Sequence, residues 1–397
     1  MIQSVLISFV TISLTGGLIH HKQPTIPETS TGAEGTYELV VSAGNNKFNG
    51  TLQLALVQER LVGQITLALP GNTINLAIQT EEPTKTLLEF KVSSPATKIT
   101  ATTSGDSIYG VLFLTHGRAF PYTGKKTNQS VNRILKDAFA QLPIYFNHSD
   151  YGTAFSTMSI NEMYLLMSTY IEDFTNQSIM ILEKDSEGWR NANKVSFSGK
   201  FSDRSPHCSH DGRWLYFAST RPPIEDGSEE KSYNLWRVSF QDGSFGKPEI
   251  LADLSSEGND YQPCVTKKGI YFISDRKGGK GGQDVYFAAY EGNGFGSPVN
   301  VSEVNSNSSE ISVYVDPGEG IMLLATSSPG DGHQGNDDLY RFTRISEKWT
   351  NSINLGSTVN TFANEYGAFL SKDKNTLYYT SDLLPPGKLM SRPFKID

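Results

Sequence analysis

The sequence predicts an all-β protein: a C-terminal β-propeller of five blades, or alternatively six, preceded by a small antiparallel β-sandwich or barrel domain. A pattern of a carboxylate, a short apolar strand, a turn and an aromatic-rich strand occurs five times between residue 150 and the C-terminus. Successive carboxylates are 53, 57, 50 and 55 residues apart, which suits one four-stranded blade per repeat. Before the repeats, residues 36–123 alternate apolar and polar residues between turn residues, as antiparallel strands do.

The first 35 residues precede the predicted domains. Residues 2–19 are apolar with Ser, Thr and Gly interspersed, a length that fits a secretory signal better than a spanning helix. We therefore predict a signal peptide at residues 1–22, although only the terminal amine supplies its positive charge, and a linker at residues 23–35. No Cys follows the apolar run, so a lipid anchor is not expected. The mature protein is expected to be periplasmic or secreted and to have no transmembrane span.

Residues 36–123 predict a small β domain of about six or seven strands. Nothing in this region has the spacing of a catalytic motif. Residues 124–135 are expected to connect it to the propeller, and residues 131–142 to form one short helix capped by Asn128 or Ser130. The strands are expected at residues 37–41, 51–57, 61–69, 73–78, 87–92 and 107–115.

The propeller is expected to span residues 136–397, with four antiparallel strands in each blade. Turns such as Asp211-Gly212 supply the left-handed backbone that a tight hairpin needs. The first strand follows the carboxylate, at residues 152–156, 205–209, 262–266, 312–316 and 367–371. The second strand is the aromatic run, at residues 164–167, 215–218, 270–273, 322–325 and 377–380. The fourth strand begins near Trp189, Phe245, Phe295 and Trp349.

The last repeat has no equivalent of this fourth aromatic residue before the chain stops at Asp397. An open strand edge invites aggregation, so some other segment is expected to pair with it. In the other repeats a similar distance separates the fourth aromatic residue from the next carboxylate. The same distance before Asp150 corresponds to residues 134–136. We therefore predict that residues 134–146 supply the missing outer strand. The alternative is a sixth, degenerate blade.

Several stretches of the repeats share one motif: 203–207 with Leu-Tyr-Phe-Ala-Ser at 215–219, Ile-Tyr-Phe-Ile-Ser-Asp-Arg at 270–276, Gly-Asn-Asp-Asp-Leu-Tyr at 335–340 and Leu-Tyr-Tyr-Thr-Ser-Asp at 377–382. With these stretches the repeats resemble the TolB-type, WD-repeat-like propeller repeats of bacterial periplasmic proteins, over about 250 residues. The first repeat departs from the resemblance, because Asn161-Glu162 replaces the Asp-Gly turn. The resemblance implies a propeller that serves as a binding or scaffolding module at the cell envelope, and no single chemistry.

Composition and missing motifs exclude several classes of function. The net charge is −8 without a Lys/Arg cluster, so a nucleic-acid partner is not expected. The two cysteines, Cys208 and Cys264, are expected to be buried free thiols, with a disulfide or metal pair as the alternative. The sequence contains no Gly-x-Ser-x-Gly, His-Glu-x-x-His or phosphate-binding Gly-x-x-x-x-Gly-Lys-Ser/Thr motif.

The candidate site is a ring of carboxylates at one mouth of the propeller channel. If the strands run up and down, the start of every first strand lies on the same face as the Gly-rich loops at 278–282 and 330–335. The structural alternative is that each acid accepts turn hydrogen bonds or pairs with an Arg such as Arg204, Arg221 or Arg276. A ligand role would instead place a cationic group, or Ca²⁺, among carboxylates that repel one another. The predicted ligand-binding residues are Asp150, Asp203, His207, Asp260, Tyr261, Glu310, Glu365 and Tyr366.

The sequence therefore favours an exported, non-catalytic binding or scaffold module for an envelope protein or a glycan. No catalytic residue and no resident cofactor are expected, with calcium kept as an alternative. The second hypothesis is a hydrolase or lyase acting on polysaccharide or peptide. In that case Asp203, His207 and Glu310 would be the first candidates for acid–base roles.

Overall fold

The computed structural model describes residues 33–43, 46–57, 60–69, 72–80, 87–92, 98–113, 119–127, 152–170, 176–186, 188–223, 232–328, 330, 332–361, 363–383 and 387–395. Their secondary structure is strands β1 to β29 and one short 3-10 turn at Ala252–Leu254, with no α-helix among them. This confirms the all-β prediction. The predicted signal peptide, nearly all of the linker, the short helix at 131–142 and the outer strand at 134–146 lie outside the described residues. No helix found in the described part of the chain has the length and apolar character to cross a membrane.

The N-terminal domain is a barrel of eight antiparallel strands in sequence order, in which the last strand, β8, pairs with the first. The sequence predicted about six or seven strands, and the six segments named there do not include β6 or β8. In β6 only Ile99 and Ala101 are fully buried, and β8 contains Pro121 and Gly124, which favour a loop. The strands are β1 (Gly35–Ala43), β2 (Asn46–Val57), β3 (Arg60–Leu69), β4 (Asn72–Thr80), β5 (Leu87–Val92), β6 (Lys98–Ser104), β7 (Ser107–Phe113) and β8 (Ala119–Lys126).

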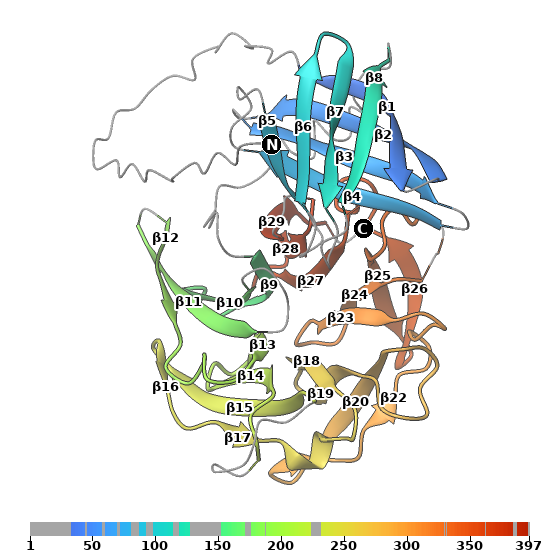
Figure 1. Cartoon of the computed structure of the whole chain (residues 1–397). Coiled ribbons are helices and arrows are strands. Elements are labelled where there is room, and N and C mark those ends of the chain that lie inside the picture. The colour runs from blue at the N-terminus through green and yellow to red at the C-terminus, as the bar shows by residue number, and fades with distance from the viewer. Residues whose placement is uncertain are drawn as a thin grey trace. The chain divides into compact units, whose positions relative to one another are not determined.

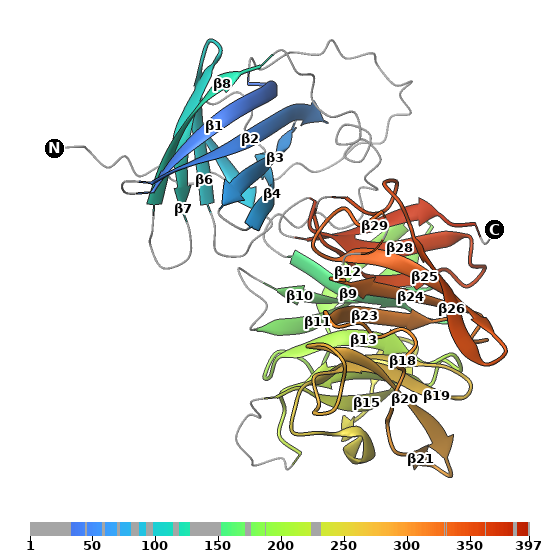
Figure 2. The same ribbon diagram turned by 90° about the vertical axis from the view of Figure 1, so that its right-hand side faces the viewer.

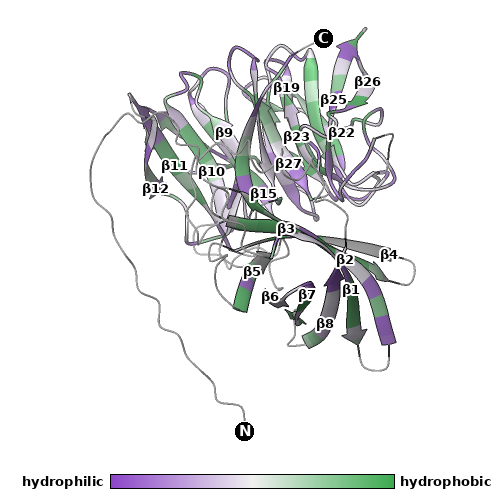
Figure 3. Ribbon diagram, turned by 90° about the horizontal axis from the view of Figure 1, so that it is seen from above, coloured by the Kyte–Doolittle hydropathy of each residue, from purple (hydrophilic) through white to green (hydrophobic). Residues whose placement is uncertain are grey.

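Side chains that alternate along the strands fill the barrel. In β1, Tyr37, Leu39 and Val41 are buried while Glu38 and Val40 are exposed. Hydrophobic and hydrophilic residues are accordingly mixed along these strands (Figure 3). Pairing β8 with β1 leaves no free sheet edge, which protects a small β domain from pairing with other chains.

The C-terminal domain is a propeller of five sheets that follow one another around a common axis (Figures 1 and 2). Each blade begins with an innermost strand, and these strands contact one another in a closed cycle, β9 to β13, β18, β23, β27 and back to β9. The first three blades are β9 (Gly152–Met158), β10 (Tyr164–Tyr170), β11 (Gln177–Asp185) and β12 (Gly188–Lys194); β13 (Asp203–Cys208), β14 (Trp214–Ser219), β15 (Asn234–Gln241), β16 (Ser244–Phe245) and β17 (Glu249–Ile250); and β18 (Asp260–Val265), β19 (Gly269–Ser274), β20 (Asp284–Glu291), β21 (Gly294–Phe295) and β22 (Val299–Asn300).

The last two blades are β23 (Glu310–Val315), β24 (Ile321–Thr326), β25 (Asp338–Ile345) and β26 (Lys348–Asn354); and β27 (Glu365–Leu370), β28 (Thr376–Ser381) and β29 (Lys388–Pro393). Each predicted first and second strand falls within or beside the observed one. Within the described residues the last sheet has only three strands. The missing fourth strand of the last repeat is therefore confirmed, and its predicted replacement at 134–146 stays a prediction.

A repeated backbone hydrogen bond shows that the ring closes after five blades. The first residue of an inner strand donates from its amide to the carbonyl just before the third strand of the preceding blade. Glu310 bonds Gln283 in this way at 2.9 Å, and Glu365 bonds Asp337 at 2.9 Å. Thr153 of the first blade makes the same bond to Gly387 of the last, at 3.0 Å. The last blade therefore meets the first as any blade meets the next, and a sixth blade has no place in the ring.

Candidate functional site

The repeated carboxylate begins the inner strand in four blades, and a threonine replaces it in the first blade. Equivalent hydrogen bonds in the turns after the inner strands align the first two blades. Ser159 bonds Asn161 in the first blade at 2.6 Å, and Ser209 bonds Asp211 in the second blade at 2.6 Å. Counting back from these serines places Thr153 opposite Asp203. Asp150, the residue that the sequence spacing selected, lies outside the described residues. In the first blade the sequence spacing therefore selects a residue three positions before Thr153, the structural equivalent of Asp203.

Asp203 and Asp260 are held by a serine and an arginine from the end of the second strand of their own blade. Asp203 accepts hydrogen bonds from Ser219 at 2.6 Å and from Arg221 at 2.7 Å. Asp260 accepts the equivalent bonds from Ser274 at 2.7 Å and Arg276 at 2.7 Å. Both carboxylates are fully buried, with 0% of their side chains exposed. Each buried charge is therefore neutralised by an arginine within its blade.

Glu310 and Glu365 occupy the same position without an arginine. Glu365 accepts hydrogen bonds from the amide and hydroxyl of Thr361, both at 2.7 Å, and from the hydroxyl of Ser381 at 2.6 Å. Glu310 is bonded by Ser306 and Thr326 in the same manner. Burial raises the pKa of Glu365 to about 8 and also raises that of Glu310. The absence of the arginine is therefore accompanied by a shift of both carboxyls towards the neutral form.

The four described carboxylates thus have the hydrogen bonds that the structural alternative anticipated. Arg221 and Arg276 are the pairing arginines, whereas Arg204 stacks instead over the rings of Phe155, Tyr233 and Tyr261, at 4.8, 5.5 and 5.2 Å. None of the four carboxylates is exposed at a channel mouth. Binding of a ligand by these acids stays a prediction, since no ligand is present.

The two predicted tyrosines follow the carboxylates and are also largely buried. Tyr261 is 7% exposed and Tyr366 is 4% exposed. The Tyr366 hydroxyl bonds Asp382 at 3.1 Å, and burial raises the pKa of Asp382 to about 6. Both tyrosines contact neighbouring rings, Tyr261 with Tyr233 and Tyr366 with Phe155. In the structure they are packing residues at this end of the inner strands.

A cavity of about 350 Å³ lies on the axis at the other end of the inner strands. Its lining comes from all five blades, through the ends of the inner strands and the turns that follow them. We call these turns, at residues 159–163, 209–213, 266–268, 316–320 and 371–375, the inner turns, and the cavity the axial pocket. Of the predicted site residues, only His207 lines it. The axial pocket is therefore on the face opposite to the one that the sequence favoured.

The floor of the axial pocket is apolar and narrow. Beneath this floor the channel shrinks to a space of about 20 Å³, which His207, Tyr314 and Phe369 also line, together with the polar side chains of Ser156, Ser205 and Gln262. Burial lowers the pKa of His207 to about 4, so this imidazole is neutral at pH 7. Met158, Val265, Val315 and Leu370 complete the apolar part of the lining.

The rim of the axial pocket is cationic. Lys267 and Lys372 line it and are exposed, and neither has an ion-pair partner among the described residues. Lys374 also lines the pocket but pairs with buried Asp316 at 2.7 Å. Glu162 is the acidic residue of the lining, and it accepts the backbone amide of Lys372 at 2.8 Å. The pocket mouth is thus positively charged in a chain whose net charge is −8.

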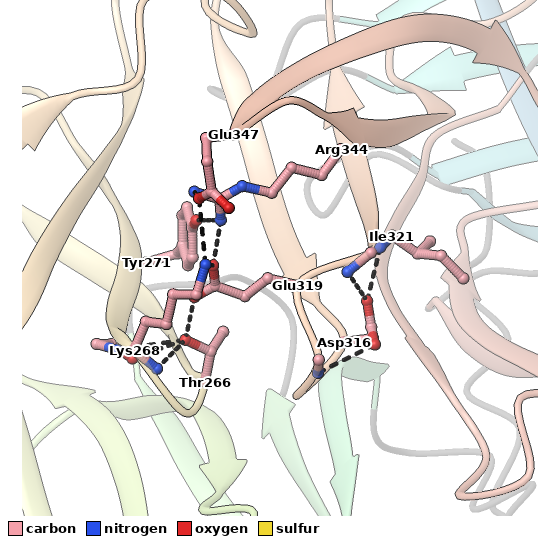
Figure 4. Close-up of polar contacts among 11 residues, drawn as sticks. Thr266, Lys268, Tyr271, Asp316, Glu319, Ile321, Arg344 and Glu347 are labelled. Carbon is pink, nitrogen blue, oxygen red and sulfur yellow. Dashed lines mark hydrogen bonds and ion pairs between the residues drawn. The ribbon is translucent and has the colours of Figure 1, made fainter.

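Polar contacts between neighbouring blades hold the inner turns around the axial pocket. Glu319, in the fourth blade, accepts a hydrogen bond from Thr266 of the third at 2.6 Å and pairs with Arg344 (Figure 4). Arg344 also bonds Tyr271 of the third blade at 3.2 Å and Glu347 at 3.0 Å. The Asp316–Lys374 and Glu162–Lys372 contacts join the next two pairs of blades. The pocket rim is therefore built from turns that are fixed to one another.

Sequence reasoning missed the lysines because they sit at the least similar position of the repeat. Lys267 and Lys372 follow directly after the Thr266 and Ser371 that end the inner strands, where the other blades have Ile160, His210 and Pro317. Aligning the repeats on the turn serines and threonines would have shown that these five residues form a ring.

The described residues contain no arrangement that identifies a catalytic site. No group of three or more His, Cys, Asp or Glu side chains among them is placed to hold a metal ion. Cys208 and Cys264 are free and buried, which confirms the prediction for the cysteines. Burial raises the pKa of each thiol to about 12, which keeps both thiols protonated. The geometry suits binding of a ligand by a cationic rim over an apolar floor.

Comparison with known proteins finds distant structural likeness only. No family model and no curated protein matches the sequence. Among solved structures, a putative TolB from Agrobacterium tumefaciens is 12% identical, with 61% of this chain and 77% of that chain covered and a TM-score of 0.41. TolB from Acinetobacter baumannii is 11% identical over 86% of this chain and 76% of that one, with a TM-score of 0.40. An α-L-arabinofuranosidase from Lactobacillus brevis is 13% identical over 64% and 94%, with a TM-score of 0.43. None of these scores supports an inference about function.

Proposed function

We propose that this protein is an exported, non-catalytic binding module of the cell envelope, which takes a protein or glycan ligand in the axial pocket of its propeller. The observation that carries the proposal is the pocket itself, which all five blades line and which has lysines of the third and fifth blades at its rim and an apolar floor. A few placed polar groups around an apolar floor are typical of ligand sites. The β-barrel domain provides a second surface for partners.

A binding role agrees with the acid–base properties of the site. General acid–base catalysis needs a group that can reach the substrate and whose pKa is near the working pH. Three carboxyls with raised pKa values, Glu310, Glu365 and Asp382, are 0%, 0% and 4% exposed. The carboxyl of Asp337, whose pKa burial raises to about 6, is partly exposed but does not line the axial pocket. His207 faces the pocket, but its pKa of about 4 makes it a weak base at neutral pH.

The ligand experiment compares envelope extracts passed over immobilised wild-type protein and over a Lys267→Glu/Lys372→Glu variant. We expect a ligand that wild type retains and the variant loses, because charge reversal repels an anionic partner at the rim. Lys277→Glu is the control, because Lys277 is 92% exposed and lies outside the axial pocket. Identical capture by all three proteins would rule out the axial pocket as the site.

The hydrolase or lyase alternative is tested on the same proteins. A panel of polysaccharides and peptides is incubated with wild type and with His207→Ala, and new chain ends are measured. We expect no turnover by either protein. Turnover that is lost in His207→Ala would replace the binding role with an enzymatic one.

Export rests on the apolar segment at residues 2–19, and cell fractionation tests it. We expect the full-length protein, expressed in a bacterium with a periplasm, to appear in the periplasmic or secreted fraction without residues 1–22. Replacing Leu6 and Val10 with Asp should keep the protein in the cytoplasm, because a charged core stops signal-peptide function. Retention of the unaltered protein in the cytoplasm would contradict export.

A further inference from the structure

A second, larger cavity opens beside the axial pocket. It has a volume of about 820 Å³ and lies between the first two blades, on the same face. We call it the side groove. Ser159, Ile160 and Cys208 line both cavities, so the two share a wall. Together they form a path that runs from the propeller axis outward between the blades.

Aromatic side chains line the side groove. Tyr164 and Phe240 meet edge to face, with ring centroids 5.7 Å apart, and Phe240 stacks on Phe245 at 5.2 Å. Trp214 lines the groove as well, with the guanidinium of Arg237 stacked 4.2 Å from its ring. Tyr164, Trp214 and Phe245 are each partly exposed. The groove therefore offers planar apolar rings at a surface that water reaches.

Polar groups surround these rings without a strong net charge. Ser239, Gln241, Asp242 and Ser244 line the groove and are exposed. Arg213 also lines it, and its charge is balanced by Asp211 at 2.6 Å. The groove thus combines aromatic planes with hydroxyl, amide and carboxylate groups, in contrast to the cationic rim of the axial pocket.

We propose that the side groove and the axial pocket form one continuous site for a linear acidic polysaccharide. The CH-rich faces of its sugar rings lie on the aromatic side chains of the groove, and their hydroxyls bond the polar rim. A uronic acid carboxylate reaches the axial pocket and pairs with Lys267 and Lys372. This inference rests on the proposed function and names its ligand class.

The groove walls favour a glycan over an extended peptide. One way for an extended peptide to gain affinity is to pair with a free sheet edge. Two of the strands that border the groove are paired on both sides, β10 with β9 and β11, and β15 with β14 and with the short strands β16 and β17. The edge strand of this sheet, β16, is only two residues long, so the groove presents mainly side chains to a ligand.

Calorimetric titration of the full-length protein tests the proposal with three ligands of matched length. These are an oligogalacturonide, the neutral oligogalactose and poly-L-glutamate. We expect the oligogalacturonide to bind, with an affinity that falls as salt is added because part of it is ionic. We expect at least a tenfold weaker affinity for the neutral glycan and for the acidic peptide, on the order of the loss when one anchor of an interface is removed.

Two variants separate the two halves of the site. Lys372→Ala removes a rim charge, and Trp214→Ala removes an aromatic plane; each is expected to weaken oligogalacturonide binding about tenfold. Ser244→Trp is the second groove variant, since it fills the groove without removing a wall, and thermal unfolding checks that each variant is folded. Lys277→Ala and Tyr109→Ala, which remove an exposed lysine and an exposed tyrosine elsewhere, are the matched controls and should bind as wild type does.

Each other outcome has a distinct meaning. If Lys372→Ala weakens binding but both groove variants bind as wild type does, the continuous site is wrong and the axial pocket alone binds the ligand. If poly-L-glutamate binds as tightly and with the same dependence on Trp214, the ligand is an acidic peptide and the glycan inference fails. If the oligogalacturonide is shortened during the titration, the proposed binding function itself fails. If none of the three ligands binds, the acidic-glycan inference fails, while the capture experiment above still decides the proposed function.

Discussion

At the scale of single residues, the buried acid that begins the inner strand is stabilised in two chemical ways, depending on the blade. In the second and third blades a short Asp meets an arginine that lies two residues beyond the end of the second strand. In the fourth and fifth blades that arginine is replaced by Ser328 and Leu383, and the acid is the longer Glu. Without a cation the buried acid is stabilised in its neutral form, as the raised pKa of Glu365 shows.

The unusual pKa of Glu365 predicts a dependence of stability on pH. Because its pKa is about 8 in the folded protein and near 4.5 when unfolded, the folded state binds the extra proton between these pH values. Stability should therefore be complete below about pH 4.5 for this group and fall as the pH rises towards 8, by on the order of a few kcal/mol. Glu365→Gln should remove most of this slope, as measured by urea unfolding at pH 5 and pH 8. An unchanged slope in the variant would contradict the assignment.

The arginine-paired acids predict a different response. Asp203→Asn leaves Arg221, whose side chain is 9% exposed, without its counter-charge, and should lower the free energy of unfolding by about 3–5 kcal/mol. Urea unfolding measures this change, and Asp203→Asn/Arg221→Met should recover part of it because no buried charge remains. Glu257→Gln, in the exposed pair with Lys277, is the control and should cost about 0–1 kcal/mol. If Asp203→Asn lowers the free energy of unfolding no more than the control does, the buried Asp203–Arg221 pair is not needed for stability.

At the scale of elements, the inner turns carry both the packing of neighbouring blades and the rim of the axial pocket. Glu319 illustrates this, since its backbone has a positive φ of 56° and its carboxylate contacts Thr266 of the preceding blade and Arg344 of its own. A turn that only reversed the chain would not need a buried carboxylate at this point. The contact fixes the turn against the neighbouring blade, and with it the wall of the pocket.

Two substitutions of acids that contact Arg344 measure how much the Glu319 contact contributes to stability. Glu319→Gln keeps the shape of a side chain that is 1% exposed but removes its charge, and should lower the free energy of unfolding by about 1–3 kcal/mol. Glu347→Gln removes the other acid at the same arginine; the Glu347 side chain is 74% exposed, so this change should affect stability less than Glu319→Gln does. Chemical denaturation compares the two variants. Equal changes in the free energy of unfolding would mean that the burial of Glu319 does not determine how much this side chain contributes to stability.

The strands of the propeller could be predicted from the sequence because periodic patterns decide them locally. Asp211-Gly212 marked a turn, and the aromatic run at 215–219 marked the strand after it, in agreement with β14. The candidate site could be predicted only in part. A bulge shifts the pairing of the inner strand between Arg204 and His207, so simple alternation does not decide which side chains reach the axis. The lysines of the cationic rim come from two inner turns about a hundred residues apart, at 266–268 and 371–375, and no local pattern links them.

At the scale of the whole molecule, closure of the ring makes the last blade depend on the first. The Thr153–Gly387 hydrogen bond joins residues that are 234 positions apart, and the core around Tyr379 contains Phe155 of the first blade as well as residues of the last two. Such long-range contacts are formed late and are costly in chain entropy. Among the described residues no further strand extends the last sheet beyond β29, so the segment that follows β29 in this sheet would contribute to the stability of the ring.

We predict that residues 134–146 cover this edge, and proline substitutions in the full-length protein test it. Proline removes an amide donor and is tolerated poorly inside a paired strand, so Phe139→Pro/Tyr145→Pro should destabilise the last blade, by about 1–3 kcal/mol for each ladder hydrogen bond that is lost. Hydrogen exchange measures the effect, because amides of β29 that bond an outer strand should lose protection while those of β19 change least. Gln129→Pro, in the segment before the predicted strand, is the control and should leave β29 protected. An edge strand without a partner exchanges its amide hydrogens readily. If β29 stays protected in the double variant, a different part of the chain therefore completes the blade.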